Sequence, residues 1–510
     1  MDKKKGTLNV SVSLLSRVVL LFAALYVRRI LIRYIGNDVN GLNSLYVSII
    51  GMLSISELGV GSAIVFSMYK PIVSGNTRQV SALYCLYKKY YKIVGGVILG
   101  SGILIMPFLP ALIGDYETLS VNVYETFFLT LISVVISYFY SAKSSLIEAH
   151  KDNYITTIIL TVSQLVRFGL QIVAILCWKS YIIYLVCQII ETILIWILTE
   201  VVIAQKYKRL TILRESIDSD TKTEVNRNIR AMFMHKIGSV LVNTVDSIII
   251  SGFIGVVAVG KYSNYNVIAG VVAGIIARFF SPLTSVVGHL CAEGNSDEIR
   301  HYYYRFYYLN YCLGVVFFLG YFSVIDSVVA FCFGTGVEVS RPIVFIISLN
   351  HFTKFMRMTT LLFRDASGAF YNDRWKPIAE GVVNLILSLV FVNLFPTDYR
   401  IVGVIVATII TTLFICHIVE PYVVFRKLFG HSPGRFYLTN YIYTVLFTVG
   451  LFLLERLMHH FDNFLVSILM NGMMSMAVSL FLFASLTMTD RGFRNEVKKY
   501  LNALLGRRRR

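Results

Sequence analysis

Apolar runs of about 20 residues recur along the whole chain, separated by short polar stretches. At about 1.5 Å per residue, a helix of that length crosses the hydrocarbon core of a bilayer. Hydrophobic residues make up 56% of the 510 positions and charged residues only 15%, so little polar sequence remains for a soluble domain. The pattern predicts an all-α polytopic membrane protein with about 14 transmembrane helices. Their expected centres are residues 21, 56, 102, 134, 165, 192, 241, 270, 314, 349, 386, 411, 446 and 475.

The formal net charge of +18 is concentrated in alternate loops. With the N-terminus inside, most lysines and arginines fall on the cytoplasmic side, including the C-terminal RRRR, as the positive-inside rule requires. We therefore expect both termini to be cytoplasmic and no nucleic-acid partner. The first apolar stretch is too long for a signal peptide and contains Arg17, so we expect it to be an uncleaved first helix.

The first part of the chain recurs in the second half. A shift of 219 places Arg17 on Lys236, and it also superposes the glycines at 36, 41, 51, 75 and 95 on those at 255, 260, 270, 294 and 314. With a shift of 221, HKDNY at 150–154 lies over YNDRW at 371–375. A register sustained over this length indicates an internal duplication, and in duplicated transporters the ligand site commonly lies between the repeats. Arg17 and Lys236 are then expected to face one another.

The duplication predicts two six-helix lobes around a central cavity. Residues 1–204 are expected to form the N-terminal lobe with helices 1–6, and residues 231–428 the C-terminal lobe with helices 7–12. The polar segment 205–230 is the expected cytoplasmic linker. Residues 436–487, which have no counterpart in the repeat, are expected to add two helices. Residues 488–510 form a basic cytoplasmic tail able to lie on anionic headgroups.

Several positive side chains fall inside apolar segments. An isolated charge at membrane depth costs roughly 2.5–3.5 kcal/mol, so such groups are expected to face a partner or a wet cavity. Arg17 and Arg28 are eleven residues apart and return to nearly the same helix face. Asn350, Lys354, Arg357 and Arg364 follow at spacings of four, three and seven and are expected to form a second cationic stripe on one helix face. Pairing of Arg17 with Glu57 remains an alternative, as does snorkelling at the inner membrane edge for the second stripe. The candidate cavity cations are Arg17, Arg28, Lys236, Arg278, Lys354 and Arg357.

Few acidic residues lie at membrane depth, chiefly Glu57 and Asp246. Asp246 either pairs with a cavity arginine or binds H⁺ or Na⁺ together with polar groups such as Asn384 and Thr411. An intramembrane carboxylate is a functional candidate by default. With more cations than acids, the cavity is expected to be positive. Guanidinium groups match phosphate oxygens through charge-assisted hydrogen bonds, so the expected substrate is an anion, most simply a phosphate.

Enzyme motifs are missing from the sequence. It contains no zinc-type His/Cys spacing, no Walker A motif and no GxSxG elbow. We therefore expect no catalytic residues, no resident metal and no cofactor, with coupling to an H⁺ or Na⁺ gradient or to the membrane potential as the expected energy source.

Four stretches together resemble the Wzx-type polysaccharide flippases of the multidrug/oligosaccharidyl-lipid/polysaccharide exporter (MOP) superfamily. They are the opening NVSVSLLSRVVLLFAALYVRRILIRYIGNDVNGLNSLY, SISELGVGSA with YKPI, NTVDSIIISGFIGVVAVGKYSNY, and LLFRDASGAFYNDRWKPIAEGVVNLILS. The resemblance covers residues 6–430. It implies that a cationic central cavity receives a lipid diphosphate and its sugars, with Arg17, Lys236 and Arg278 at suitable positions.

The resemblance further implies a function. Undecaprenyl-diphosphate-linked oligosaccharide units would move from the inner to the outer leaflet of the bacterial cytoplasmic membrane by alternating access, for surface polysaccharide biosynthesis such as O-antigen or capsule. The expected partners are that lipid, membrane lipids and the polymerase machinery, and the expected state is a monomer. Two alternatives stay open: a cation-coupled small-molecule exporter of the same superfamily, and an integral membrane glycosyltransferase or polymerase.

Overall fold

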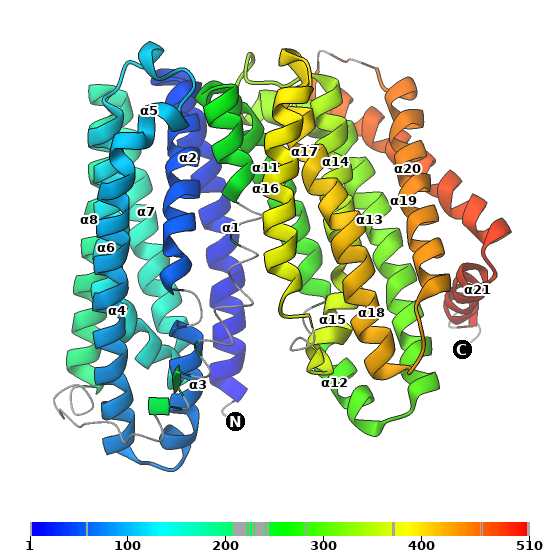
Figure 1. The fold of residues 1–510 in the computed structure, drawn as a ribbon, viewed down its shortest axis with the longest axis horizontal. Helices are drawn as coiled ribbons and strands as arrows, with labels where there is room; N and C mark the ends of the chain where they lie inside the picture. The colour runs from blue at the N-terminus through cyan, green and yellow to red at the C-terminus, as the bar shows by residue number, and fades with distance from the viewer. Residues whose placement is uncertain are drawn as a thin grey trace. The chain divides into compact units, whose positions relative to one another are not determined.

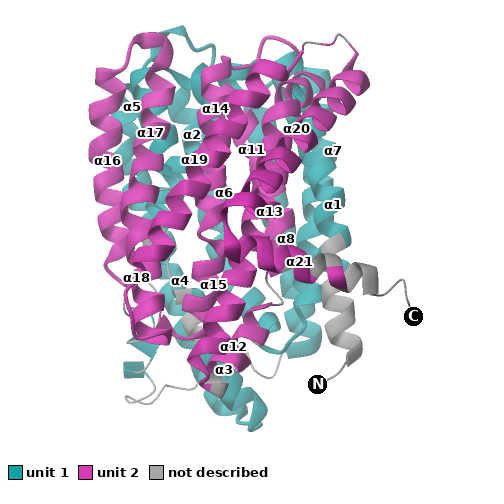
Figure 2. Ribbon diagram, turned by 90° about the vertical axis from the view of Figure 1, so that its right-hand side faces the viewer, with its two compact units in different colours: residues 1–260, 332–334 teal, residues 261–331, 335–510 magenta. Residues whose placement is uncertain are grey.

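The computed structural model describes residues 3–57, 60–207, 244–280, 283–369, 373–459 and 463–506, with a few isolated residues between these ranges. Throughout this part of the chain the secondary structure is helical and contains no strand (Figure 1). The expected all-α polytopic fold is therefore confirmed. Two compact units are present and are described separately below (Figure 2).

Nine helices in the described ranges are long and apolar enough to cross a membrane. They coincide with nine of the 14 expected segments. The other five segments are those centred near residues 21, 56, 241, 270 and 349, so the count of 14 stays a prediction. These five carry the interior charges identified in the sequence, which lowers their mean hydropathy, and the segments near 56 and 241 are only partly described. Such helices are tolerated where they border a cavity.

The first unit comprises residues 1–260 and 332–334. In it, α6 packs against α4 and α8, while α7 packs against α1 and α8. Buried apolar and tyrosine side chains fill the space between α2, α4 and α6. Its helices are α1 (Lys3–Tyr34), α2 (Asn37–Leu53), α3 (Val60–Val73), α4 (Thr77–Ile105), α5 (Leu109–Leu112), α6 (Val123–Ala149), α7 (Asn153–Trp178) and α8 (Tyr181–Val202), followed by Thr244–Phe253.

The second expected helix is not continuous. After α2 the chain forms the 3₁₀ turn η1 (Ser54–Glu57), and α3 starts at Val60. The break places Glu57 at the end of a short helical turn, where its carboxylate is held by a neighbouring helix as described below.

The second unit comprises residues 261–331 and 335–510. Within it α16 packs against α17, α14 against α17, and α19 against α20. α11 ends at Phe280 and α12 begins at Leu283, and the kink or break that Pro282 predicts from the sequence lies outside the described residues. Its helices are α11 (Val256–Phe280, beginning in the first unit), α12 (Leu283–Glu293), α13 (Ser296–Phe333), α14 (Arg341–Met356), α15 (Met358–Ala366), α16 (Lys376–Leu394), α17 (Arg400–Thr411), α18 (His417–Leu428), α19 (Gly434–Leu457), α20 (Phe464–Thr489) and α21 (Arg491–Gly506).

Equivalent positions of the sequence repeat have the same backbone conformation. Gly36 and Gly255 each precede a helix with φ of 140° and 119°, and Gly75 and Gly294 have φ of 68° and 79°. Residues with a Cβ rarely adopt these values, so glycine is required at all four positions. The repeat is therefore visible in local geometry as well as in sequence.

The residues after the second glycine pair also act alike. Asn76 accepts a hydrogen bond from the backbone N–H of Gln79 at 3.1 Å and caps α4. Asn295, 219 residues later, accepts from the backbone N–H of Glu298 at 3.2 Å and caps α13. An asparagine side chain at this position satisfies one of the free N–H groups at a helix start. Both copies thus begin their long helix by the same mechanism.

Two equivalent glycines of the repeat lie against the backbone of the other copy within the first unit. A Cβ added to Gly41 of α2 would lie 1.8 Å from the carbonyl oxygen of Val256, and one added to Gly260 would lie 2.5 Å from that of Asn37. The Asn37 side-chain amide also donates to the carbonyl of Val257 at 3.1 Å. Small residues permit such close helix contacts.

Candidate functional site

Helix α1 carries the first two candidate cations. Arg17 is exposed, and Arg28, about three turns further on, is half-buried with its guanidinium 5.6 Å from the ring centroid of Phe333. A cation over an aromatic face is attracted by the ring quadrupole. Of the two arginines predicted on one face of α1, Arg17 is therefore accessible and Arg28 contacts an aromatic ring.

Two further candidates cannot be placed by their side chains. Lys236 lies outside the described residues, and Arg278 lies near the end of α11 in a stretch where the side chains are not described. The expected encounter of Arg17 and Lys236 between the repeats stays a prediction.

The two intramembrane acids of the first half lie in the first unit. Glu57 accepts a hydrogen bond from the hydroxyl of Tyr138 on α6 at 2.7 Å. Asp246, on the helix Thr244–Phe253, is 5% exposed. A buried carboxylate needs hydrogen bonds or a charge partner to offset its lost hydration. Glu57 is half-buried, and the tyrosine hydroxyl supplies one such hydrogen bond to it.

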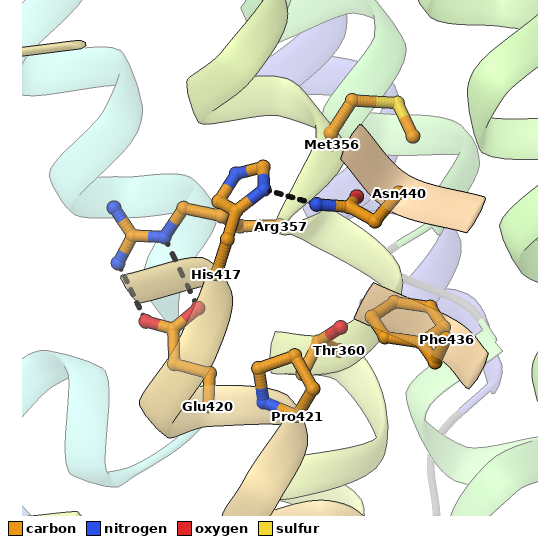
Figure 3. Close-up of a pocket in the computed structure, with 8 residues that line it drawn as sticks. All are labelled: Met356, Arg357, Thr360, His417, Glu420, Pro421, Phe436 and Asn440. Atoms are coloured by element: carbon orange, nitrogen blue, oxygen red, sulfur yellow. Dashed lines mark hydrogen bonds and ion pairs between the residues drawn. The ribbon is translucent and has the colours of Figure 1, made fainter. Parts of the chain in front are cut away.

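In the second unit, Arg357 is part of a buried group of four charges. Its guanidinium donates to both carboxylate oxygens of Glu420 at 2.6 and 3.1 Å (Figure 3). It also lies 3.5 Å from Glu380. The ammonium of Lys376 lies 2.5 Å from Glu420 and 3.2 Å from Glu380. We call Arg357, Lys376, Glu380 and Glu420 the charge cluster. It holds two positive and two negative groups and is formally neutral.

The second cationic stripe differs in the structure from the sequence prediction. The sequence predicts Asn350, Lys354, Arg357 and Arg364 on one face of a single helix, but α14 ends at Met356 and α15 begins at Met358. Arg364 pairs with Asp373 at 2.9 Å, and Lys354 is half-buried on α14. At the two arginines, positive charge is therefore balanced by carboxylates inside the same unit.

The sequence reading missed the acids that provide this balance. Glu380 and Glu420 are 4% and 0% exposed, and Asp373 is 3% exposed. Each lies near the polar end of an apolar segment, where a solvent-exposed position is the ordinary expectation. A usable signal was present: Lys376 and Glu380 are four residues apart, and oppositely charged residues at this spacing meet on one helix face.

Irregular helix geometry surrounds the charge cluster. The helix between α17 and α18 widens into the π-helical turn η7 (Thr412–Cys416), and Pro421 lies inside α18. Next to the cluster, His417 and Asn440 are joined by a side-chain hydrogen bond of 2.6 Å (Figure 3). A small cavity here has room for about one water molecule. Single π-helical turns occur frequently at functional positions.

Polar side chains continue from the charge cluster along α16. Lys376, Glu380, Asn384 and Ser388 follow at spacings of four and are all buried. The amide of Asn384 donates to the hydroxyl of Thr408 at 2.9 Å. Among the described residues, the amide oxygen of Asn384 and the hydroxyls of Ser388 and Thr412 have no hydrogen-bond partner.

The hydroxyl of Thr411, the other polar candidate in this region, is already hydrogen-bonded. Its hydroxyl donates to the carbonyls of Ala407 and Thr408 in its own helix, at 3.1 and 2.9 Å. The unsatisfied oxygens nearby are of the type that hard cations accept as ligands. A small-cation site formed by these oxygens, with Asn384 and Thr411 as contributors, stays a prediction.

The sequence of the first half matches a known family model. Residues 7–286, more than half of the chain, match the family described as "Polysaccharide biosynthesis protein". The chain belongs to this family. The resemblance to polysaccharide flippases noted from its motifs is thereby confirmed at the level of the family. A comparison with curated proteins found no match to this sequence.

Solved structures show the fold of this family member. It is similar to the lipid II flippase MurJ in an inward closed conformation, with a TM-score of 0.61, 14% identity, and 93% of this chain and 98% of MurJ covered. It is also similar to an inward-facing multidrug resistance MATE transporter of the MOP superfamily, with a TM-score of 0.58, 12% identity, and coverage of 80% and 96%. The chain therefore has the multi-pass helical membrane fold of these two structures.

Proposed function

We propose that this protein moves undecaprenyl-diphosphate-linked oligosaccharide units from the inner to the outer leaflet of the bacterial cytoplasmic membrane, by alternating access. The single observation that carries the proposal is the match to the polysaccharide biosynthesis family, joined to a fold shared with a lipid II flippase. The distribution of lysine and arginine supports a cytoplasmic location for both termini. The lipid-linked units then reach the outer face, where polymerisation follows.

Arginines are the proposed contacts for the diphosphate. A guanidinium presents paired N–H donors that match phosphate oxygens, and charge-assisted bonds of this kind are about twice as strong as neutral ones. Arg17 suits this role because it is exposed on α1, whereas Arg357 is held by two carboxylates of the charge cluster. We therefore assign Arg17 and Arg278 to diphosphate binding and expect Arg357 to serve the fold in the state described.

Arg17→Ala is expected to reduce translocation at least tenfold without loss of folded protein, because one charge-assisted hydrogen bond contributes about 1.5–3 kcal/mol. The measurement is the rate at which lipid-linked oligosaccharide becomes accessible at the opposite face of sealed vesicles. Arg278→Ala is tested in parallel. Arg33→Ala is the matched control, since Arg33 is an exposed arginine of the same helix. Unchanged translocation rates in both variants would contradict the proposed diphosphate site. Absence of translocation by the unmodified protein would contradict the proposed function.

The membrane potential is the proposed driving force. A lipid diphosphate carries about two negative charges, and an inside-negative potential favours outward movement of each by about 2.3 kcal/mol per 100 mV. Transport in vesicles is expected to speed up under a potential of the physiological sign and to slow down when the sign is reversed, with all ion gradients at zero. Rates indifferent to the potential would rule out electrogenic transport while leaving the flippase proposal intact.

Coupling to H⁺ or Na⁺ is proposed for the return step, in which the cavity cations have lost the substrate. The candidate acids are Asp246 and Glu57 in the first unit. In the second unit the support comes from the unsatisfied buried oxygens near Asn384, with Thr411 beside them. A cation bound in the first unit would offset the negative charge of Asp246 or Glu57. A cation bound in the second unit would satisfy the unpartnered oxygens near Asn384.

A cation-coupled small-molecule exporter is the second candidate. It is favoured by the similarity to a MATE transporter fold and by the buried acids Glu380 and Glu420, which make the second unit less positive than the sequence predicts. The same vesicles decide between the two functions. Uptake of an organic cation such as ethidium, without movement of lipid-linked oligosaccharide, identifies an exporter.

A further inference from the structure

A polar cavity lies inside the first unit, away from the residues assigned above. It has a volume of about 200 Å³ and opens between four helices, α4, α6, α7 and α8. Its lining combines the hydroxyls of tyrosine, serine and threonine side chains and one carboxylate, Glu148, with three aliphatic side chains. The cavity is many times larger than the 10–15 Å³ that one water molecule needs, so it can admit a small ring.

Helix α6 supplies the polar face of this cavity. Tyr140, Ser144 and Glu148 are four residues apart and therefore lie above one another on one side of the helix. The neighbouring serines already have hydrogen-bond partners. The hydroxyl of Ser145 bonds to that of Tyr87 at 3.1 Å, and the hydroxyl of Ser141 donates to the carbonyl of Ser137 in its own helix.

The three residues at this spacing are available to a ligand. Within the described part of the chain, the side chains of Tyr140, Ser144 and Glu148 have neither a hydrogen bond nor an ion pair. Thr199 of α8 also lines the cavity and is buried. The cavity thus presents several hydroxyls and one carboxylate that the fold itself does not use.

The charge of the lining excludes a phosphate. It contains no lysine or arginine, and the one carboxylate repels an anion. Lys143, also on α6, is bound to Glu200 and so is not available to the cavity. The ligand must therefore be neutral or positive.

The remaining chemistry matches a sugar. Hydroxyl groups both donate and accept hydrogen bonds, as sugar hydroxyls do, and a carboxylate accepts from two neighbouring hydroxyls. Ile159, Leu160 and Ile195 provide an apolar wall for the C–H face of a pyranose ring. We infer that this cavity is a subsite for one uncharged sugar ring of the oligosaccharide. The inference rests on the proposed function and adds a carbohydrate contact separate from the diphosphate contacts.

Sugar binding is tested on the purified full chain in nanodiscs, with tritiated glucose and tritiated N-acetylglucosamine as probes. We expect saturable binding of at least one probe in the millimolar range. Glu148→Gln keeps the size of the side chain and removes its charge, so the dissociation constant is expected to rise about tenfold. Ser144→Leu fills the cavity and is expected to abolish binding. Glu125→Gln is the matched control, because Glu125 is an exposed glutamate at the other end of the same helix.

Each outcome decides the inference. Absence of probe binding by the unmodified protein, or equal binding by Glu148→Gln and the control, overturns it. If Ser144→Leu does not fold, Glu148→Gln still provides the answer. Translocation of the lipid-linked oligosaccharide by the unmodified protein is measured separately. A protein that translocates the lipid but binds neither probe refutes only the subsite, whereas a protein that translocates nothing refutes the proposed function.

Discussion

Gly41→Val should destabilise the protein by more than about 3 kcal/mol, beyond the usual range for overpacking. The reason is that a Cβ at Gly41 would lie 1.8 Å from the carbonyl oxygen of Val256, a backbone atom that cannot rotate away. The two segments can then only separate, which breaks the hydrogen bond from Asn37 to Val257. The measurement is the unfolding midpoint of the detergent-purified protein.

Gly96→Val is the control for this experiment. Gly96 also lies in a transmembrane helix, α4, but a Cβ there meets no atom within 4 Å. Its substitution is expected to change the midpoint little. Equal midpoints for the two variants would contradict the close approach of α2 and α11 within the first unit.

Glu420→Gln should produce the second large loss, about 3–5 kcal/mol, because removal of one partner from a buried ion pair leaves an uncompensated charge. Arg357 and Lys376 would then share only Glu380, at 3.5 and 3.2 Å. Adding Lys376→Met makes the cluster neutral again and is expected to recover part of the loss. Unfolding of the single and double variants in denaturant measures this coupling.

Glu455→Gln is the matched control for Glu420→Gln. Glu455 also pairs with an arginine, Arg341, at 2.5 Å, but its side chain is 38% exposed. An exposed pair contributes about 0–1 kcal/mol, so the control should lose little. A Glu420→Gln variant as stable as this control would show that the charge cluster does not hold α14, α16 and α18 together.

Much of the architecture could be predicted from sequence because it depends on local or periodic properties. Recurring apolar runs predict helices across a bilayer, and nine of the expected segments are confirmed by apolar helices in the described residues. The repeat was also readable, since its glycines occupy positions that require positive φ, as at Gly36 and Gly255. The family followed from the order and spacing of motifs, and the match over residues 7–286 confirms it.

What sequence alone determined about this protein is therefore its helical membrane fold, its duplication and its family. Which charges are free and which are paired was decided only by the tertiary structure. Arg357 and Arg364 look alike in sequence to Arg17, yet their partners Glu420 and Asp373 lie on other helices or loops. Ion pairs depend on distances of a few ångströms between segments remote in sequence, and the energy of a buried charge depends on such a partner. Helix periodicity identifies the face on which a charge lies, whereas packing between helices determines what that charge meets.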